Sequence, residues 1–241
     1  MPRFFTTQIV REKVSITGED AAHLSKVLRA KPGEQIIVCD MAGTDYLCEI
    51  SEISPSLVIL SVLSSCPTVA EPKLRVRLFQ GVPKGDKMEW IIQKAVELGV
   101  SAVFPLFTNR CVSRPDLKTQ PKKVERWGKI AAEAAKQSGR GRIPQVKDFC
   151  SFSDAVQMLE DGEIGILFYE KGGSPLSHFL SSAPAKLALF IGPEGGWESE
   201  EIEQARTAGI QIATLGPRIL RTETAPLCAL SAAMYACGEL E

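Results

Sequence analysis

The pattern of hydrophobic and polar positions changes character near residue 70. Before that point, β-branched or alternating runs lie between Gly and Pro turns, and one amphipathic stretch, 21–29, predicts a helix with Leu24, Val27 and Leu28 on one face. The expected strands are 13–17, 35–39, 46–53 and 57–63. Several strands with one short helix predict a small β-barrel domain over residues 1–71, and the proline-bearing stretch 64–72 predicts a linker.

Beyond this stretch, short apolar runs alternate with amphipathic ones. The expected strands are 75–82, 102–107, 164–169, 187–191 and 211–215, and the expected helices are 86–98, 119–138, 199–208 and 224–237. Two of the strands, 164–169 and 187–191, are apolar throughout, which is typical of strands covered on both faces. The alternation predicts an α/β domain with a largely parallel sheet over residues 72–241.

Composition narrows the class of protein. The chain has 241 residues, 44% of them hydrophobic and 24% charged, which excludes a disordered or collagen-like protein. No apolar run reaches the ~18 residues of a membrane span, and the first residues lack the apolar core of a signal peptide, so we expect a cytoplasmic protein. The only histidines are His23 and His178, and the seven cysteines form no C-x-x-C pair, so we expect reduced thiols and no metal site.

The net charge of the chain is close to zero, but basic and acidic residues are unevenly distributed along the sequence. Residues 73–147 carry 17 basic and 6 acidic side chains, whereas residues 148–241 carry 5 and 14. Such a basic segment is typical of a surface that meets a polyanion, which favours nucleic-acid contact. The alternative is a solvated basic face that pairs internally with the acidic last third of the chain.

Two glycine-bearing loops follow late strands, where open α/β sheets bind their ligands. The first, 191–197 (IGPEGGW), lets backbone amides approach a ligand closely, but it has neither the dinucleotide nor the P-loop spacing. Acidic residues crowd the helix start beside it and disfavour a phosphate, so a neutral or cationic ligand fits better. These residues are Glu194, Glu198, Glu200 and Glu201.

The second loop, 215–226 (LGPRILRTETAP), places charged residues in an apolar stretch. Arg218, Arg221 and Glu223 are costly to bury there unless they pair or face a site. The plainer alternative is that Arg221 and Glu223 form a surface pair and that Thr222 or Thr224 caps the following helix.

Four motifs in this order resemble the RsmE family, the bacterial 16S ribosomal RNA uridine-N3 methyltransferases. They are KGDKMEWIIQKAVELG at 84–99, EAAKQSGR at 133–140, IGPEGG at 191–196 and LGPRILRTETAPL at 215–227. The opening residues 3–5 (RFF) and 23–29 (HLSKVLR) are also similar to the family, so the resemblance runs nearly end to end. Two positions depart from the family pattern: Asn109 stands where an acid is common, and Trp197 where Phe is usual.

The resemblance implies a PUA-like β-barrel followed by a SPOUT methyltransferase domain whose late strands and closing helix form a trefoil knot. It also implies S-adenosyl-L-methionine as cofactor and a homodimer. Carried over by position, the expected cofactor-binding residues are Tyr169, Glu170, Ile191, Gly192, Pro193, Gly195, Gly196, Leu215, Gly216, Ile219, Leu220, Arg221, Thr224 and Ala225. For the dimer, small apolar residues on the closing helix suit a close contact, and Leu230→Glu is expected to yield a monomer.

The implied substrate suggests roles for charged residues. Uracil N3 must lose its proton before it can attack, so we expect Arg221 to stabilise the anion and Glu223 or Glu170 to accept the proton. The basic residues expected to contact 16S ribosomal RNA are Arg3, Lys26, Arg29, Lys84, Lys87, Arg110, Lys136, Arg140 and Arg142. Two other functions stay open: a SPOUT enzyme that methylates another RNA atom, such as a ribose 2′-hydroxyl, and a non-catalytic RNA-binding assembly factor.

Overall fold

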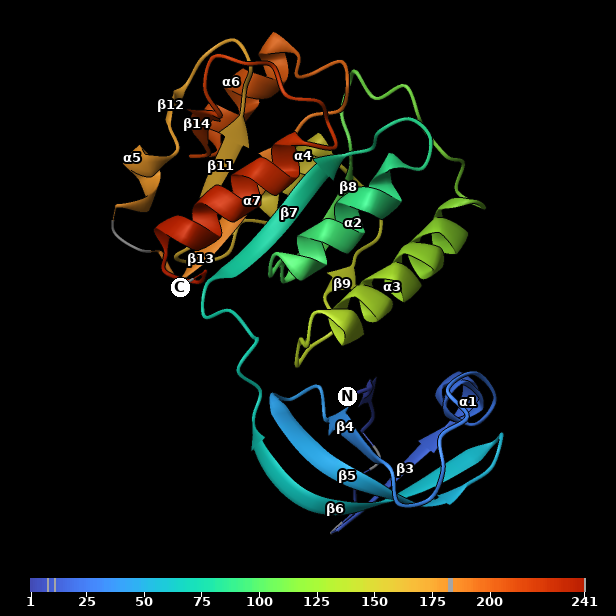
Figure 1. The fold of residues 1–241 in the computed structure, drawn as a ribbon. Helices are drawn as coiled ribbons and strands as arrows, with labels where there is room; N and C mark the ends of the chain where they lie inside the picture. Colours follow the sequence, from blue (N-terminus) through green and yellow to red (C-terminus); the bar gives the residue numbers. More distant parts are fainter. Residues whose placement is uncertain (8, 11, 182–183, 241) are drawn as a thin grey trace. The chain divides into compact units, whose positions relative to one another are not determined.

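The computed structural model of the protein describes residues 1–241 except 8, 11, 182, 183 and 241. It divides into two compact units (Figure 1). The first unit comprises Met1–Glu71 and Ala135–Ile143, and the second comprises Pro72–Ala134 and Pro144–Glu241. The stretch Ala135–Ile143 therefore packs with the first unit, although it follows the start of the second in sequence.

The first unit is a curled six-stranded sheet in the order β1-β4-β5-β6-β3-β2 (Figure 1). Its pairs are antiparallel except β1 with β4. Alternate residues such as Val14, Ile16 and Leu60 point into its hydrophobic core, as the period of two predicts. The strands are β1 Arg3–Phe5, β2 Ile9–Val10, β3 Lys13–Thr17, β4 Gln35–Cys39, β5 Thr44–Ile53 and β6 Leu57–Pro67.

Two expectations for this unit were wrong. The linker does not begin at residue 64, because β6 continues to Pro67 and pairs with Thr44 of β5, beyond a shift in register at Leu47/Cys48. The expected helix begins earlier as α1, Gly18–Ala22, and continues as a π-helix, His23–Val27. Because the wider π-helical turn changes the angle between successive side chains, Leu24 is buried while Val27 is 65% exposed.

The second unit is a sheet in which every pair of neighbouring strands is parallel. Its order is β10-β8-β7-β13-β11-β14-β12, with β9 beside β8. The strands are β7 Arg75–Gly81, β8 Ala102–Phe107, β9 Gln145–Val146, β10 Cys150–Ser151, β11 Ile164–Phe168, β12 Ser174–Pro175, β13 Lys186–Ile191 and β14 Gln211–Thr214. The long central strands lie within about one residue of their predicted positions.

Helices cover both faces of this sheet. In Figure 1, α2 and α7 lie together on one face, and α4 and α6 lie together on the other. The apolar face predicted for α2 is buried as expected, including Met88, Ile92 and Val96. The helices are α2 Lys87–Glu97, α3 Gln120–Gln137, α4 Phe152–Gln157, α5 Ser177–Leu180, α6 Ser199–Thr207 and α7 Ala225–Ala236.

The end of the chain crosses back over an earlier loop. β14 lies beyond β11, yet α7, which follows it, packs on β13 and β7 in the middle of the sheet. On this return path Thr222 is buried and donates a hydrogen bond to the Gly192 carbonyl, 2.9 Å away, in the loop after β13. Such a return past a preceding loop is rare among protein connections and is the crossing that a trefoil knot requires.

Candidate active site

The carboxyl ends of β11, β13 and β14 surround a cleft of about 290 Å³. The structure brings most of the predicted cofactor residues together around it: Tyr169, Glu170, Ile191, Gly192, Pro193, Gly196, Leu215, Gly216, Ile219, Leu220, Arg221 and Ala225. Gly195 and Thr224 do not line the cleft. Seven further residues line the cleft without being among the predicted cofactor residues, namely Lys87, Phe168, Glu194, Trp197, Thr214, Arg218 and Thr222. Phe168 and Thr214 end their strands, so the predicted strand ends were the signal that could have found them.

Close backbone approach shapes the loop after β13. A Cβ on Gly81, at the end of β7, would lie 2.6 Å from the Pro193 backbone nitrogen, so a larger residue there would displace the loop. Gly196 has a φ of +68°, and a Cβ on it would lie 3.0 Å from Glu170 Oε1. The cleft wall thus depends on glycine at two separate points of contact.

Buried hydrogen bonds fix the two loops. The Trp197 indole N–H donates to the Phe168 carbonyl over 2.9 Å, a bond that a phenylalanine at this position could not make. The Gln80 side-chain amide donates to Thr222 Oγ1 over 3.2 Å, and Thr222 donates in turn to Gly192. Thr222 therefore joins the loops and does not cap α7, and Thr224 makes no side-chain capping bond either.

Three charged residues meet at one edge of the cleft. The Lys87 ammonium lies 3.2 Å from Glu194 Oε1 and 3.0 Å from Glu223 Oε2. Among the described residues the ion-pair partner of Glu223 is therefore Lys87, and the alternative in which Glu223 pairs with Arg221 is not observed. Arg221 is exposed and lines the cleft, whereas Glu223 does not line it.

The ion pairs alter the protonation of these groups. Burial opposes ionisation of Glu223, but the Lys87 ammonium outweighs it and lowers the pKa of the carboxyl. The contacts with Glu223 and Glu194 raise the pKa of Lys87. All three groups are thus ionised near neutral pH, and Glu223 is a weak proton acceptor.

The acidic helix start beside the glycine loop has a largely structural role. Glu198 and Glu201 form the capping box of α6, and Glu201 also accepts a bond from the Asn109 backbone N–H over 2.8 Å. Arg110 donates to Glu198 over 2.8 Å and to the Gly195 carbonyl over 3.0 Å. Of the four acids that the sequence placed near the ligand, only Glu194 lines the cleft. Asn109 acts there through its backbone, while its side chain is exposed.

Three residues expected to contact RNA are held in ion pairs of the first unit. Arg3 pairs with Asp45 at 2.5 Å, Lys136 with Asp20 at 2.8 Å, and Arg140 with Glu71 at 2.8 Å. The Arg140 side chain is only 5% exposed. These partners are distant in sequence, so the charge pattern could not reveal them. Arg3, Lys136 and Arg140 therefore contribute to the packing within the first unit, and their contact with RNA stays a prediction.

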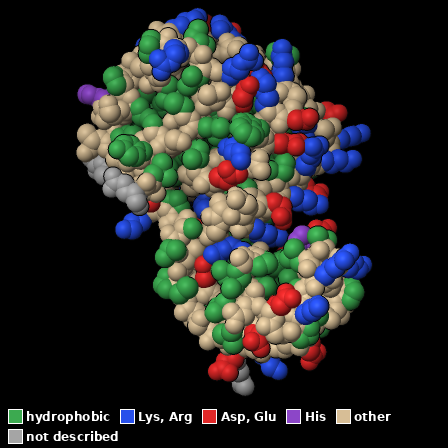
Figure 2. All heavy atoms as spheres, in the orientation of Figure 1, with side chains coloured by type: hydrophobic (Ala, Val, Ile, Leu, Met, Phe, Trp, Pro, Cys, Tyr) green, Lys and Arg blue, Asp and Glu red, His purple; other side chains and the backbone are tan. Residues whose placement is uncertain are grey.

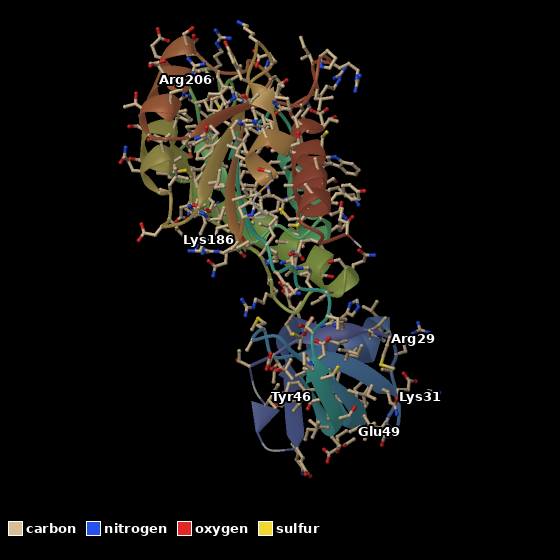
Figure 3. The ribbon with its side chains drawn as sticks, turned by 90° about the vertical axis from the view of Figure 1, so that its left-hand side faces the viewer. Arg29, Lys31, Tyr46, Glu49, Lys186 and Arg206 are labelled. Atoms are coloured by element: carbon tan, nitrogen blue, oxygen red, sulfur yellow. The ribbon has the colours of Figure 1, made fainter. Side chains whose placement is uncertain are left out.

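Of the other six expected RNA contacts, Lys87 and Arg110 are half-buried and paired with acids, whereas four are exposed. Lys26, Arg29, Lys84 and Arg142 are exposed, and Figure 3 shows Arg29 and Lys31 extending from the ribbon at the edge of the first unit. Along α2 and α3, Lys and Arg side chains alternate with acidic ones (Figure 2). Arg126 pairs with Glu89 at 2.8 Å and Lys129 with Glu125 at 3.1 Å, yet the side chains of both basic residues are about two-thirds exposed.

Two further features are absent from the described residues. The part of the chain that the structure describes holds no group of three or more His, Cys, Asp or Glu residues that could bind a metal ion. Within the same residues, no helix combines the length and apolar character needed to cross a membrane.

Comparison with known proteins gives the family. The RNA methyltransferase domain family matches residues 70–234, and the RNA methyltransferase PUA domain family matches residues 16–63. The chain is 41% identical to ribosomal RNA small subunit methyltransferase E of Bacillus subtilis over 98% of this chain and 96% of that protein. It is 36% identical to the Synechocystis protein of the same name, over 93% of this chain and 73% of that one.

A solved structure gives the same result. The ribosomal RNA small subunit methyltransferase E from Neisseria gonorrhoeae, crystallised with S-adenosyl methionine, is 32% identical, covers 98% of this chain and 97% of its own, and has a TM-score of 0.89. With the sheet order above, this confirms the predicted fold, a PUA-like module followed by a SPOUT methyltransferase domain. The chain belongs to the ribosomal RNA small subunit methyltransferase E family, as its four motifs predicted.

Proposed function

We propose that this protein uses S-adenosyl-L-methionine to methylate N3 of a uridine in the 16S RNA of the small ribosomal subunit, in the cytoplasm. The observation that carries the proposal is the cleft at the ends of β11, β13 and β14, built by the same motifs that relate the chain to its family. The Neisseria relative, which binds S-adenosyl methionine, supports the choice of cofactor.

The residues around the cleft suit this cofactor. Gly192 and Gly196 present backbone rather than side chains, and the buried side chains of Ile191 and Trp197 offer apolar surface. Glu170 and Glu194 line the same cleft; because the charge of Glu194 is paired with Lys87, Glu170 is the carboxylate that complements a cationic sulfonium. When bound there, the cofactor would supply a methyl group activated by its sulfonium charge.

The remaining chemistry concerns the proton on uracil N3. Arg221 is exposed and lines the cleft. A guanidinium cannot be deprotonated in a protein, so this side chain is suited to stabilise the uracil anion that forms when N3 loses its proton. Of the two acids considered as proton acceptor, Glu170 lines the cleft, whereas Glu223 lies outside it and its pKa is lowered. We therefore propose Glu170 as the acceptor.

Calorimetry and methyl transfer separate the candidate functions. A methyltransferase should bind S-adenosylmethionine and transfer its labelled methyl group to small ribosomal subunits from a strain that lacks this gene, but not to large subunits. A non-catalytic assembly factor should bind the RNA and show no affinity for the cofactor.

We also propose that the protein forms a homodimer through α7. Leu230 cannot serve as the test residue, because it is only 1% exposed within a single chain, and a charge there would unfold the subunit. The accessible face of the helix presents Cys228, Ala232 and Tyr235 instead. Tyr235→Glu is expected to give a folded monomer by light scattering, and a variant that stays dimeric would remove this face from consideration.

A further inference from the structure

The Lys87 side chain is held at the edge of the cleft by ion pairs rather than by hydrophobic packing. It is the first residue of α2, and its ammonium reaches the edge of the cleft between two acids that come from different loops. Glu194 belongs to the loop after β13, and Glu223 to the loop after β14. Glu194 Oε1 is also fixed by the Lys84 backbone N–H, 3.1 Å away. The lysine is thus held from two sides while its side chain stays 33% exposed.

Lys87 lines the cleft and keeps part of its side chain in contact with solvent. Two other lining residues, Ile191 and Trp197, are at most 2% exposed. An RNA base must approach the cleft from solvent, where it meets the accessible lining residues first. Lys87 and Arg221 both line the cleft and are both reached by solvent.

Both cations retain donors for a ligand. An ammonium has three N–H groups, and the contacts of Lys87 with Glu194 and Glu223 leave the third available, as far as the described residues show. Within the same part of the chain, the structure records no ion pair for the Arg221 guanidinium. Donors from two elements, α2 and the loop after β14, therefore flank one cleft.

The chemistry of uracil matches two flanking donors. When the N3–H bond breaks, its proton passes to the acceptor carboxylate, and the electron pair left on N3 spreads onto the carbonyl oxygens O2 and O4 on either side. One cationic donor at each oxygen would lower the free energy of that anion most effectively, because the charge develops at both.

We propose that Lys87 is a second catalytic residue, which donates to one carbonyl oxygen of the target uracil while Arg221 donates to the other. Glu194 and Glu223 are then positioning residues that hold the ammonium at the cleft edge. The proposal rests on the function proposed above, and it gives Glu223, which does not line the cleft, a role other than proton transfer.

The test compares Lys87→Met with Lys94→Met, a matched control on the same helix. Lys94 pairs with Glu97 at 2.8 Å and does not line the cleft. We expect Lys87→Met to slow single-turnover methyl transfer at neutral pH by ~100-fold or more, as removal of one such donor does elsewhere. Its affinity for S-adenosylmethionine by calorimetry and its thermal midpoint should stay close to those of the control.

The pH dependence of the methyl-transfer rate distinguishes this catalytic role from a purely structural one, in which Lys87 only joins two loops. Without the ammonium, the bound uracil is a weaker acid, so the rate of Lys87→Met should continue to rise at alkaline pH where that of the wild type has levelled. Glu223→Gln, which keeps the lysine but removes one support, should show a smaller loss and a smaller displacement of the profile. Lys87→Arg should restore part of the rate.

If Lys87 only joins the loops after β13 and β14, we expect a different result. Cofactor affinity and rate would fall together in Lys87→Met, with an unchanged pH profile, and that result would overturn the proposal. A wild-type rate in Lys87→Met would overturn it as well. If the wild-type product is not 3-methyluridine, the proposed function itself fails, whatever the variants do.

Discussion

The cleft and the basic stretch 73–147 differ in what holds their functional groups in place. The cleft is built largely from backbone, and hydrogen bonds of buried side chains such as Trp197 and Thr222 fix its loops. The basic stretch relies on long side chains whose positions depend on acids elsewhere, as in the pairs of Arg126 with Glu89 and Arg140 with Glu71. A ligand meets a preformed surface in the first case. In the second, it must compete with internal carboxylates.

The largest effect is expected at the cleft, for Arg221→Lys. This change keeps the charge but loses the planar fork of donors, so methyl transfer should fall by a factor of ~100 to 1000 while cofactor affinity changes little. Single-turnover rates with saturating cofactor, combined with calorimetry, separate the two quantities. Near wild-type rates in Arg221→Ala would contradict the role proposed for Arg221, and stabilisation of the uracil anion would have to be assigned to other residues.

In the basic stretch, the buried Arg140 should matter for stability rather than for RNA. Arg140→Met removes the guanidinium from Glu71, which among the described residues keeps only the backbone N–H groups of Gly141 and Arg142, and should lower the free energy of unfolding by ~1.5–3 kcal/mol, measured by chemical denaturation. Arg142→Met, two residues away and exposed, is the control and should leave stability unchanged. Equal, small effects in both variants would contradict the structural role of Arg140.

The rigidity of the cleft can be tested at Trp197. Trp197→Phe introduces the residue usual in the family but removes the indole N–H that bonds the Phe168 carbonyl, so stability should fall by ~1–3 kcal/mol. Trp90, which is 49% exposed, supplies the control, and Trp90→Phe should have little effect on the unfolding transition. A Trp197→Phe protein as stable as the wild type would show that the loop does not depend on this bond.

A smaller change is expected when exposed charges of α3 are neutralised. The triple change Lys122→Gln, Arg126→Gln and Lys129→Gln should reduce the salt dependence of RNA binding by about 0.7 to 0.9 per lost phosphate contact, without affecting cofactor binding. Lys186→Gln with Arg206→Gln, outside this stretch (Figure 3), is the control. An unchanged salt slope in the triple variant would favour internal pairing as the role of these charges.

The smallest effect concerns acid stability in the first unit. Burial opposes ionisation of Asp45, but its hydrogen bonds from Arg3 and Thr68 outweigh burial and hold the pKa of the carboxyl below its usual value. Because the folded state binds the proton less readily, the pair stabilises the protein above about pH 4 and loses this contribution as the pH falls further. The thermal midpoints of wild type and Asp45→Asn should therefore converge on acidification, and a constant difference would contradict this linkage.

Local patterns sufficed to predict some parts of the molecule. The central strands and the buried face of α2 follow from apolar runs that lie close together in sequence, whereas the residues of the cleft were predicted from the resemblance of the motifs to the family. The strands β9, β10 and β12 have two residues each, too few to show periodicity. The partners of Arg3, Arg140 and Glu223 depend on tertiary contacts over long sequence separations, which a charge count does not contain.

The most direct test of the central proposal is the identity of the methylated nucleoside. Small ribosomal subunits from a strain that lacks this gene would be incubated with the purified protein and S-adenosylmethionine, and their RNA would be digested and analysed by mass spectrometry. We expect 3-methyluridine to be absent before incubation and present afterwards. A methyl group on a ribose 2′-hydroxyl or on another base, or no new methylated nucleoside, would contradict methylation at uracil N3.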